Sequence, residues 1–103
     1  MKHMYLCTAL LMTTTAAFAA DAQAGKAFVE ENCGRCHAMG ENDESAHAEA
    51  PPFRTLSQRY PVDSIAEALA EGIVTGHPDM PQFEVEPDEI ENIIAWLNEI
   101  QQK

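Results

Sequence analysis

The sequence has few basic residues, few aromatic residues and no long apolar run. Six Lys and Arg stand against seventeen Asp and Glu in 103 residues, which gives a formal net charge of −11. Nucleic acids and anionic membrane surfaces attract basic proteins, so this charge argues against both as partners. No apolar stretch reaches the roughly 20 residues that cross a bilayer. No alternation of apolar and polar residues is long enough to predict a sheet.

The first nineteen residues have the pattern of a secretory signal peptide. Lys2 supplies the charged start, residues 5–12 form a short apolar region, and Ala17-Phe18-Ala19 matches a cleavage site. We expect cleavage after Ala19, which leaves residues 20–103 as one periplasmic domain with no stable membrane insertion. Cys7 is lost with the peptide, as is Lys2, so the mature domain is one charge more negative than the whole chain.

The rest of the chain predicts an all-α domain. A first helix is expected from the N-cap Asp21 to Cys33, and a loop without apolar periodicity covers residues 38–50. A short helical turn follows at 53–60. The next helix is predicted at 63–71, with Ser64 and Glu67 as a capping box and Gly72 as its stop.

The last helix is predicted to begin at Pro87, which suits the first helical position. Its apolar residues recur at helical spacing and form one stripe: Ile90, Ile93, Ile94, Leu97 and Ile100. Between the two C-terminal helices, the prolines of residues 73–85 argue against a continuous helix and predict a constrained loop.

One motif carries chemistry: Cys33-Gly34-Arg35-Cys36-His37, the C-x-x-C-H pattern of c-type haem attachment. On a helical turn, Cys33 and Cys36 share a face, so both sulfurs can reach one porphyrin. His37 follows at once and is placed to bind the iron as proximal ligand. The motif therefore predicts one covalently bound haem c.

Other uses of a cysteine pair find less support. A thioredoxin-like redox pair needs a βαβ context that is not visible. A zinc site needs four protein ligands, and beyond His37 the predicted mature chain offers only the isolated His47 and His77. A cysteine nucleophile needs a fold that holds a distant His and a carboxylate or amide beside it.

The second axial ligand is expected in the proline-rich loop. Met39 lies too close to His37 in the sequence to reach the opposite haem face, and His47 lies in the acidic loop. Met80 stands between two prolines that limit the loop's freedom. We favour Met80 as the distal ligand, and His77 in the same loop remains the alternative.

These residues resemble the class I cytochrome c family over the whole mature chain. Met80-Pro81 with Phe83 is similar to the family's distal methionine loop. The resemblance implies that the carbonyl of Pro51 or Pro52 accepts a hydrogen bond from the proximal imidazole. It also implies that Gly25 receives Trp96 where the first and last helices cross.

The resemblance implies three to five helices around one haem, and an electron carrier that cycles between Fe(II) and Fe(III) rather than an enzyme. Its partners would be redox proteins, with basic docking surfaces as one option for this acidic domain, which we expect to be a monomer. Two alternatives stay open. One is a haem subunit of an exported dehydrogenase or oxidase, and the other is a ligand-binding haem enzyme or sensor with Met80 detached.

Overall fold

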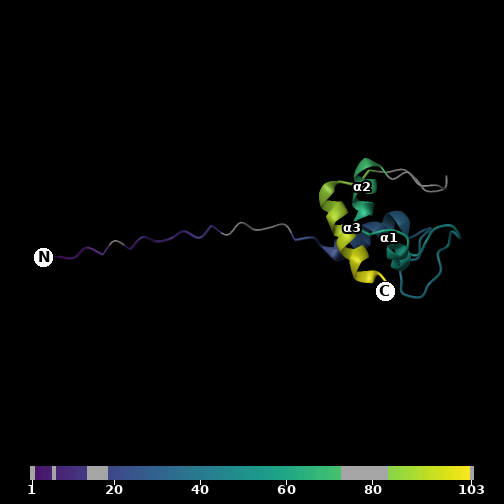
Figure 1. The fold of residues 1–103 in the computed structure, drawn as a ribbon, viewed down its shortest axis with the longest axis horizontal. Coiled ribbons are helices and arrows are strands. Elements are labelled where there is room, and N and C mark those ends of the chain that lie inside the picture. Colours follow the sequence, from purple (N-terminus) through teal and green to yellow (C-terminus); the bar gives the residue numbers. More distant parts are fainter. Residues whose placement is uncertain (1, 6, 14–18, 73–83, 103) are drawn as a thin grey trace.

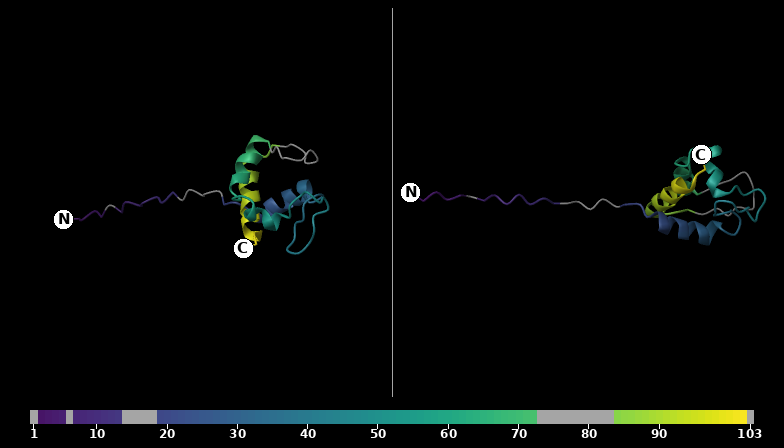
Figure 2. Two further views of the ribbon diagram at one scale, coloured as in Figure 1. Left: turned by 45° about the vertical axis from the view of Figure 1, so that its right-hand side comes forward. Right: turned by 90° about the horizontal axis from the view of Figure 1, so that it is seen from below.

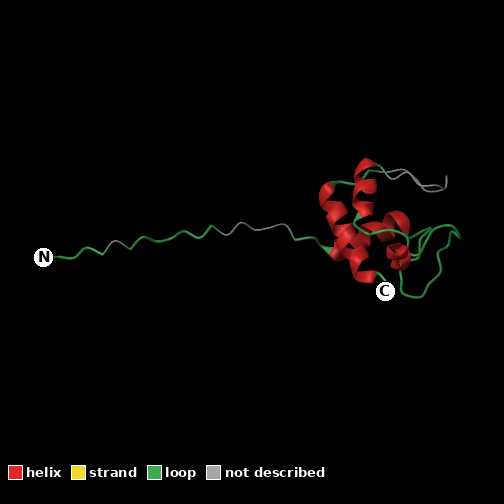
Figure 3. Ribbon diagram, viewed as in Figure 1, coloured by secondary structure: helices red, strands yellow, loops and turns green. Residues whose placement is uncertain are grey.

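The computed structural model describes residues 2–5, 7–13, 19–72 and 84–102. These contain three α-helices and one 3₁₀-helix: α1 (Ala22–Cys33), η1 (Phe53–Gln58), α2 (Ser64–Glu71) and α3 (Pro87–Ile100). Figure 3 shows only helices and loops in this part of the chain, and the all-α prediction is confirmed. The predicted loop with His77 and Met80 falls mostly on residues 73–83, outside the described residues.

The start of α1 is fixed both by its own cap and by α3. The Asp21 carboxylate accepts hydrogen bonds from the backbone N–H groups of Gln23 and Ala24, at 3.0 and 3.2 Å. These bonds satisfy two of the donors that a helix leaves open at its first turn. The backbone N–H of Asp21 donates to Asn92 Oδ1 at 2.7 Å. Asn92, only 7 % exposed, thus ties α3 to the N-cap residue of the domain's first helix.

The largest packing contact of the fold is the crossing of α1 and α3, which Figure 2 shows from two sides. Gly25 lies at this crossing, and a Cβ there would overlap the carbonyl group of Asn92. The atoms nearest to such a Cβ belong to the backbone of Asn92 and Ile93, so Gly25 admits the backbone of α3 itself.

The core is formed by one cluster of apolar side chains between α1, η1, α2 and α3. Most of the predicted stripe of α3 is in it, and the prediction of that stripe is confirmed. Each fully buried side chain of this size contributes about 1.5–3 kcal/mol. The buried members are Val29, Phe53, Leu56, Val62, Leu69, Val85, Ile90, Ile93, Trp96 and Leu97.

Helix α2 begins one residue earlier than a capping box of Ser64 and Glu67 requires. Ser64 is its first residue and Asp63 its N-cap, which makes no side-chain capping bond. The predicted box of Ser64 and Glu67 is therefore wrong. The entry is closed by backbone bonds instead, from Ser64 N–H to Pro61 O and from Ile65 N–H to Val62 O, both 3.0 Å. Gly72, with a φ of 89°, ends α2 as predicted.

The N-terminal segment extends away from the helices (Figure 1). Its described large apolar side chains are exposed to solvent, and Met4 and Tyr5 are each 89 % exposed. None of the helices in the described part of the chain is long and apolar enough to cross a membrane.

Candidate functional site

The C-x-x-C-H motif forms a tight turn at the end of α1. The backbone N–H groups of Cys36 and His37 both donate to the carbonyl of Cys33, at 3.1 and 3.0 Å. The Gly34 N–H closes the helix by donating to the carbonyls of Val29 and Glu30. Cys33 and Cys36 are half-buried free thiols, and His37 is 8 % exposed. The turn therefore brings two thiols and a buried imidazole together within five residues.

The Cys33 thiol is held in its protonated form at neutral pH. Burial, and to a smaller extent the neighbouring Cys36, raise the pKa of Cys33 to about 11. Burial has this effect because it disfavours the charged thiolate. The thiolate is the reactive species in disulfide exchange, so the protonated Cys33 thiol reacts slowly in that exchange.

The ring of His37 is oriented by the backbone of Pro51. Its Nδ1–H donates to the Pro51 carbonyl oxygen at 2.8 Å. Because a carbonyl only accepts, this bond places the proton of the neutral ring on Nδ1 and the lone pair on Nε2, as in a histidine that binds a metal through Nε2. The Pro52 carbonyl instead accepts from the Thr55 backbone N–H and hydroxyl, at 3.0 and 2.8 Å.

Phe53 covers one face of the same imidazole. The two rings are stacked, with centroids 4.5 Å apart and planes 11° from parallel. The rings of Phe53 and Trp96 form a T-shaped contact, with centroids 6.1 Å apart and planes at 81°, and the Phe53 backbone N–H donates to Ala38 O at 3.1 Å. Sequence reasoning assigned Phe53 no role at this site. Its position directly after Pro51-Pro52 was the available signal.

Side chains hold the predicted loop of residues 38–50 against η1. Arg54 Nη1 donates to the carbonyls of Asp43 and Gly40, at 2.8 and 3.3 Å, and forms an ion pair with the Asp43 carboxylate at 3.3 Å. The Ser45 hydroxyl accepts from Ala38 N–H at 3.0 Å. The backbone N–H of His47 donates to Cys36 O at 3.2 Å, which fastens this loop to the motif.

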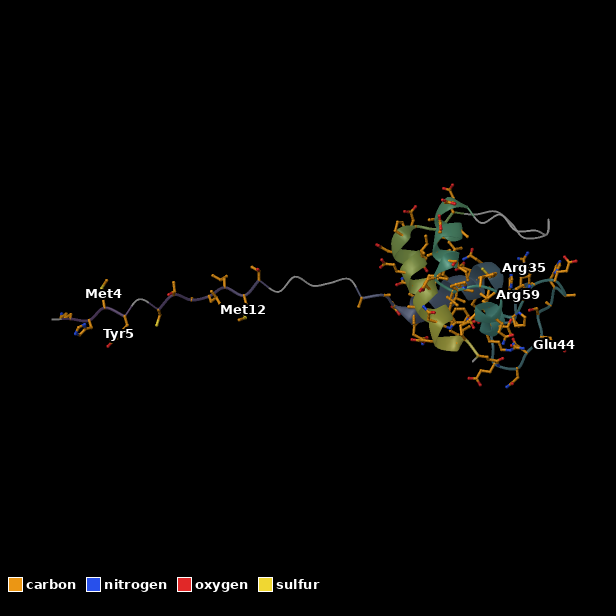
Figure 4. All side chains as sticks on the ribbon, viewed as in Figure 1. Met4, Tyr5, Met12, Arg35, Glu44 and Arg59 are labelled. Carbon is orange, nitrogen blue, oxygen red and sulfur yellow. The ribbon has the colours of Figure 1, made fainter. Side chains whose placement is uncertain are left out.

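The other sequence candidates have different surroundings. Met39 is partly buried against the apolar core. Arg35 is exposed within the motif, and Figure 4 shows it on the side away from the N-terminal segment, as it shows Arg59 and Glu44. Among the described residues, no three His, Cys, Asp or Glu side chains gather as a metal site. The described part of the chain therefore adds no support for structural zinc.

The residues present fit a covalently attached haem. Two free thiols lie one turn apart, and the imidazole beside them has its proton on the nitrogen that faces the protein backbone. The stacked Phe53 and the apolar core supply a dry, rigid support for that ligand. These are the donors that a c-type haem requires from its proximal side.

Comparison with known proteins identifies relatives along most of the chain. A family model described as cytochrome c oxidase, cbb3-type, subunit III, matches residues 20–97. The chain is 28 % identical to cytochrome c-552 of Bradyrhizobium diazoefficiens over 100 residues, 97 % of this chain and 94 % of the relative. It is 33 % identical to cytochrome c6 of a Picosynechococcus species over 89 residues, 81 % of this chain and 76 % of the relative.

Proposed function

This chain belongs to the class I c-type cytochromes, and from that premise we propose which of its residues hold the haem. The family makes it a small electron-transfer protein with covalently bound haem c rather than an enzyme. In the proposal, Cys33 and Cys36 form the two thioethers and His37 binds the iron through Nε2. Met80 supplies the second axial ligand. The hydrogen bond from His37 Nδ1 to Pro51 O is the observation that carries the proposal.

That hydrogen bond has two effects on a metal-binding imidazole. It fixes the tautomer, so Nε2 presents its lone pair. It also makes the ring a stronger donor, because the carbonyl oxygen partly balances the positive charge that the ring gains on coordination. Phe53 limits rotation of the ring. The ligand is thus already oriented by the protein.

The bound haem supplies a one-electron couple between Fe(II) and Fe(III). The protein's part is to set its potential and to keep the ligands still. A neutral methionine sulfur and apolar surroundings favour the less charged ferrous state, which raises the potential relative to two histidine ligands. Anchorage of His37 to a backbone carbonyl and a stacked ring limits movement between the two states.

Replacement of Met80 tests the distal ligand. Met80→Ala is expected to remove the methionine–iron absorption band of the ferric protein, lower the potential and speed cyanide binding. His77→Ala, three residues away in the sequence, is the matched control and should keep the wild-type spectrum. If His77→Ala lost the wild-type spectrum and Met80→Ala kept it, His77 would be the ligand.

Residues 1–19 are proposed to be a cleaved signal peptide, with residues 20–103 as the periplasmic domain. Two findings support this boundary: the described N-terminal segment has no packing against the helices, and the family match begins at residue 20. Mass spectrometry of the intact haem protein from a periplasmic extract is the test. A protein that retains residues 1–19 would contradict the boundary.

We propose that the acidic domain docks on basic surfaces of redox partners. With a net charge of −11 for the whole chain, long-range attraction to such a partner should speed encounter at low salt. Electron transfer to a small basic redox protein should therefore slow between 10 and 200 mM salt, by about tenfold or more, because salt screens exposed charges. A rate that does not depend on salt would contradict the proposal.

The description of the matching family favours a second candidate, in which the chain is the haem subunit of an oxidase complex. A subunit would stay with its partners in high salt, where electrostatic encounters dissociate. Size-exclusion chromatography of a native extract in high salt separates the two cases. A single small haem peak supports the free carrier, and a large complex supports the subunit.

A further inference from the structure

Gln101 follows the last residue of α3 and is tied to both ends of η1. Its Nε2 donates to the carbonyls of Phe53 and Leu97, at 2.7 and 2.8 Å. Its Oε1 accepts from the backbone N–H of Ser57 at 2.8 Å. Both amide hydrogens and the amide oxygen are thus in use, a combination that requires a side-chain amide.

These bonds stabilise an element that is weak by itself. Helix η1 has six residues, and a short 3₁₀-helix has poorer hydrogen-bond geometry than an α-helix. Gln101 bonds the carbonyl of its first residue and an N–H near its end, from a position 48 and 44 residues away in the sequence. The end of α3 therefore sets where η1 lies.

The first residue of η1 is the one stacked on the proximal imidazole. Phe53 is held at its N–H by Ala38 O and at its carbonyl by Gln101. Phe53 is 9 % exposed, and its ring is stacked on His37 and in a T-shaped contact with Trp96. A displacement of this backbone would move the ring, and the imidazole would lose the flat surface that defines its plane.

We propose that Gln101 is a positioning residue for the proximal haem ligand, which acts through Phe53 to fix the plane of the His37 imidazole. The inference rests on the proposed role of His37 as iron ligand. Gln101 touches neither His37 nor the motif in the contacts above. Its effect is on orientation, which decides how the imidazole overlaps the iron orbitals, and not on whether the ligand binds.

The test measures the orientation of the imidazole in the intact ferric haem protein. The NMR chemical shifts of the four haem methyl groups differ from one another by amounts that depend on the direction of the axial ligand planes. The range of these four shifts, the methyl spread, is the quantity measured. Gln101→Ala removes all three bonds and should change this spread, while the axial ligands stay in place. Gln101→Glu keeps the acceptor but lacks the donors, and should change the spread in the same direction.

Gln102→Ala is the matched control. Gln102 is the next residue and donates from Nε2 to Glu41 O at 3.2 Å, with no bond to Phe53. Its removal should leave the methyl spread at the wild-type values. A change as large as that of Gln101→Ala would show a general effect of loosening the C-terminus and would overturn the proposal.

Phe53→Leu decides whether the effect passes through the ring. It keeps an apolar side chain but removes the flat surface, and should reproduce the shift of Gln101→Ala. The double variant should add nothing further, because both changes act on one contact. Additive shifts, or a wild-type spread in Gln101→Glu, would overturn the inference.

Failure of the proposed function gives a different result. With ¹⁵N-labelled histidine, the hyperfine-shifted imidazole of the wild-type protein should be absent in His37→Ala. If the shifted imidazole persisted there, His37 would not be the ligand and the proposed function would fail. If it were absent there but unchanged by Gln101→Ala, only the positioning role would fail.

Discussion

The two ends of α3 hold the rest of the domain in different ways. Its first half lies against α1 at backbone distance, where Gly25 leaves room for the carbonyl of Asn92. Its C-terminal end reaches η1 through the amide of Gln101. The first contact joins two backbones and has no room for an added atom. The second is made by one side chain, through three hydrogen bonds of its amide group. We infer that the first sets the stability of the fold and the second the geometry at the haem ligand.

Gly25→Ala is the strongest way to break the first contact. Alanine favours a helix by about 1 kcal/mol over glycine, but here its Cβ would meet the backbone of α3, which cannot rotate away. We expect a net loss of about 3 kcal/mol, the upper part of the usual range for overpacking. Urea unfolding of the haem protein measures it.

Gly40→Ala is the control for that substitution. The atoms nearest to a Cβ at residue 40 belong to the flexible Asp43 side chain, at 3.0 Å and beyond. A loss below about 1 kcal/mol is expected because that carboxylate can shift. Equal losses in the two variants would contradict the assignment of the crossing as the tightest contact.

Asn92→Ala tests the hydrogen bond that joins the crossing to the start of α1. The Asp21 N–H would lose its partner, at a cost of about 1–2 kcal/mol for a partly buried donor. Asn98→Ala on the exposed face of the same helix should cost about 0.5 kcal/mol or less. Thermal unfolding of both variants makes the comparison. Equal stability of the two variants would show that the hydrogen bond of Asn92 does not stabilise the fold.

Arg54→Ala should have the smallest global effect. The ion pair with the half-exposed Asp43 contributes little, but the bonds to the carbonyls of Gly40 and Asp43 hold the loop. We expect amide hydrogen exchange in residues 40–47 to rise about tenfold, with an unchanged haem spectrum. Arg59→Ala, an exposed arginine at the end of η1, is the control and should leave this exchange unchanged.

Patterns between near neighbours in the sequence predicted much of the fold. The N-cap Asp21, the stop at Gly72 and the start of α3 at Pro87 are each decided within a few residues, and each is confirmed. The capping box at Ser64 was wrong for a local reason as well. The chain enters α2 through backbone turn bonds, and these place Ser64 inside the helix.

The missed contacts join distant parts of the chain. Gln101 meets Phe53 across 48 residues, and Asn92 meets Asp21 across 71. In the sequence, a polar residue at the end of an amphipathic helix cannot be distinguished from a solvated side chain. Only the fold shows which groups it contacts. The motif itself predicted the position of Cys33, Cys36 and His37 in one turn, since those residues lie within five consecutive positions. The role of Phe53 depended on where η1 lies.

The crossing of α1 and α3 also orders events in time. A chain is synthesised from its N-terminus, so α1 and the C-x-x-C-H turn exist before their partner helix does. Contacts between the first and last helices close the longest loop in the domain and form late for that reason. Until residues 87–100 arrive, Gly25 has no backbone against it and the Asp21 N–H has no Asn92. The two cysteines, at the end of α1, are thus made before the helix that packs against α1.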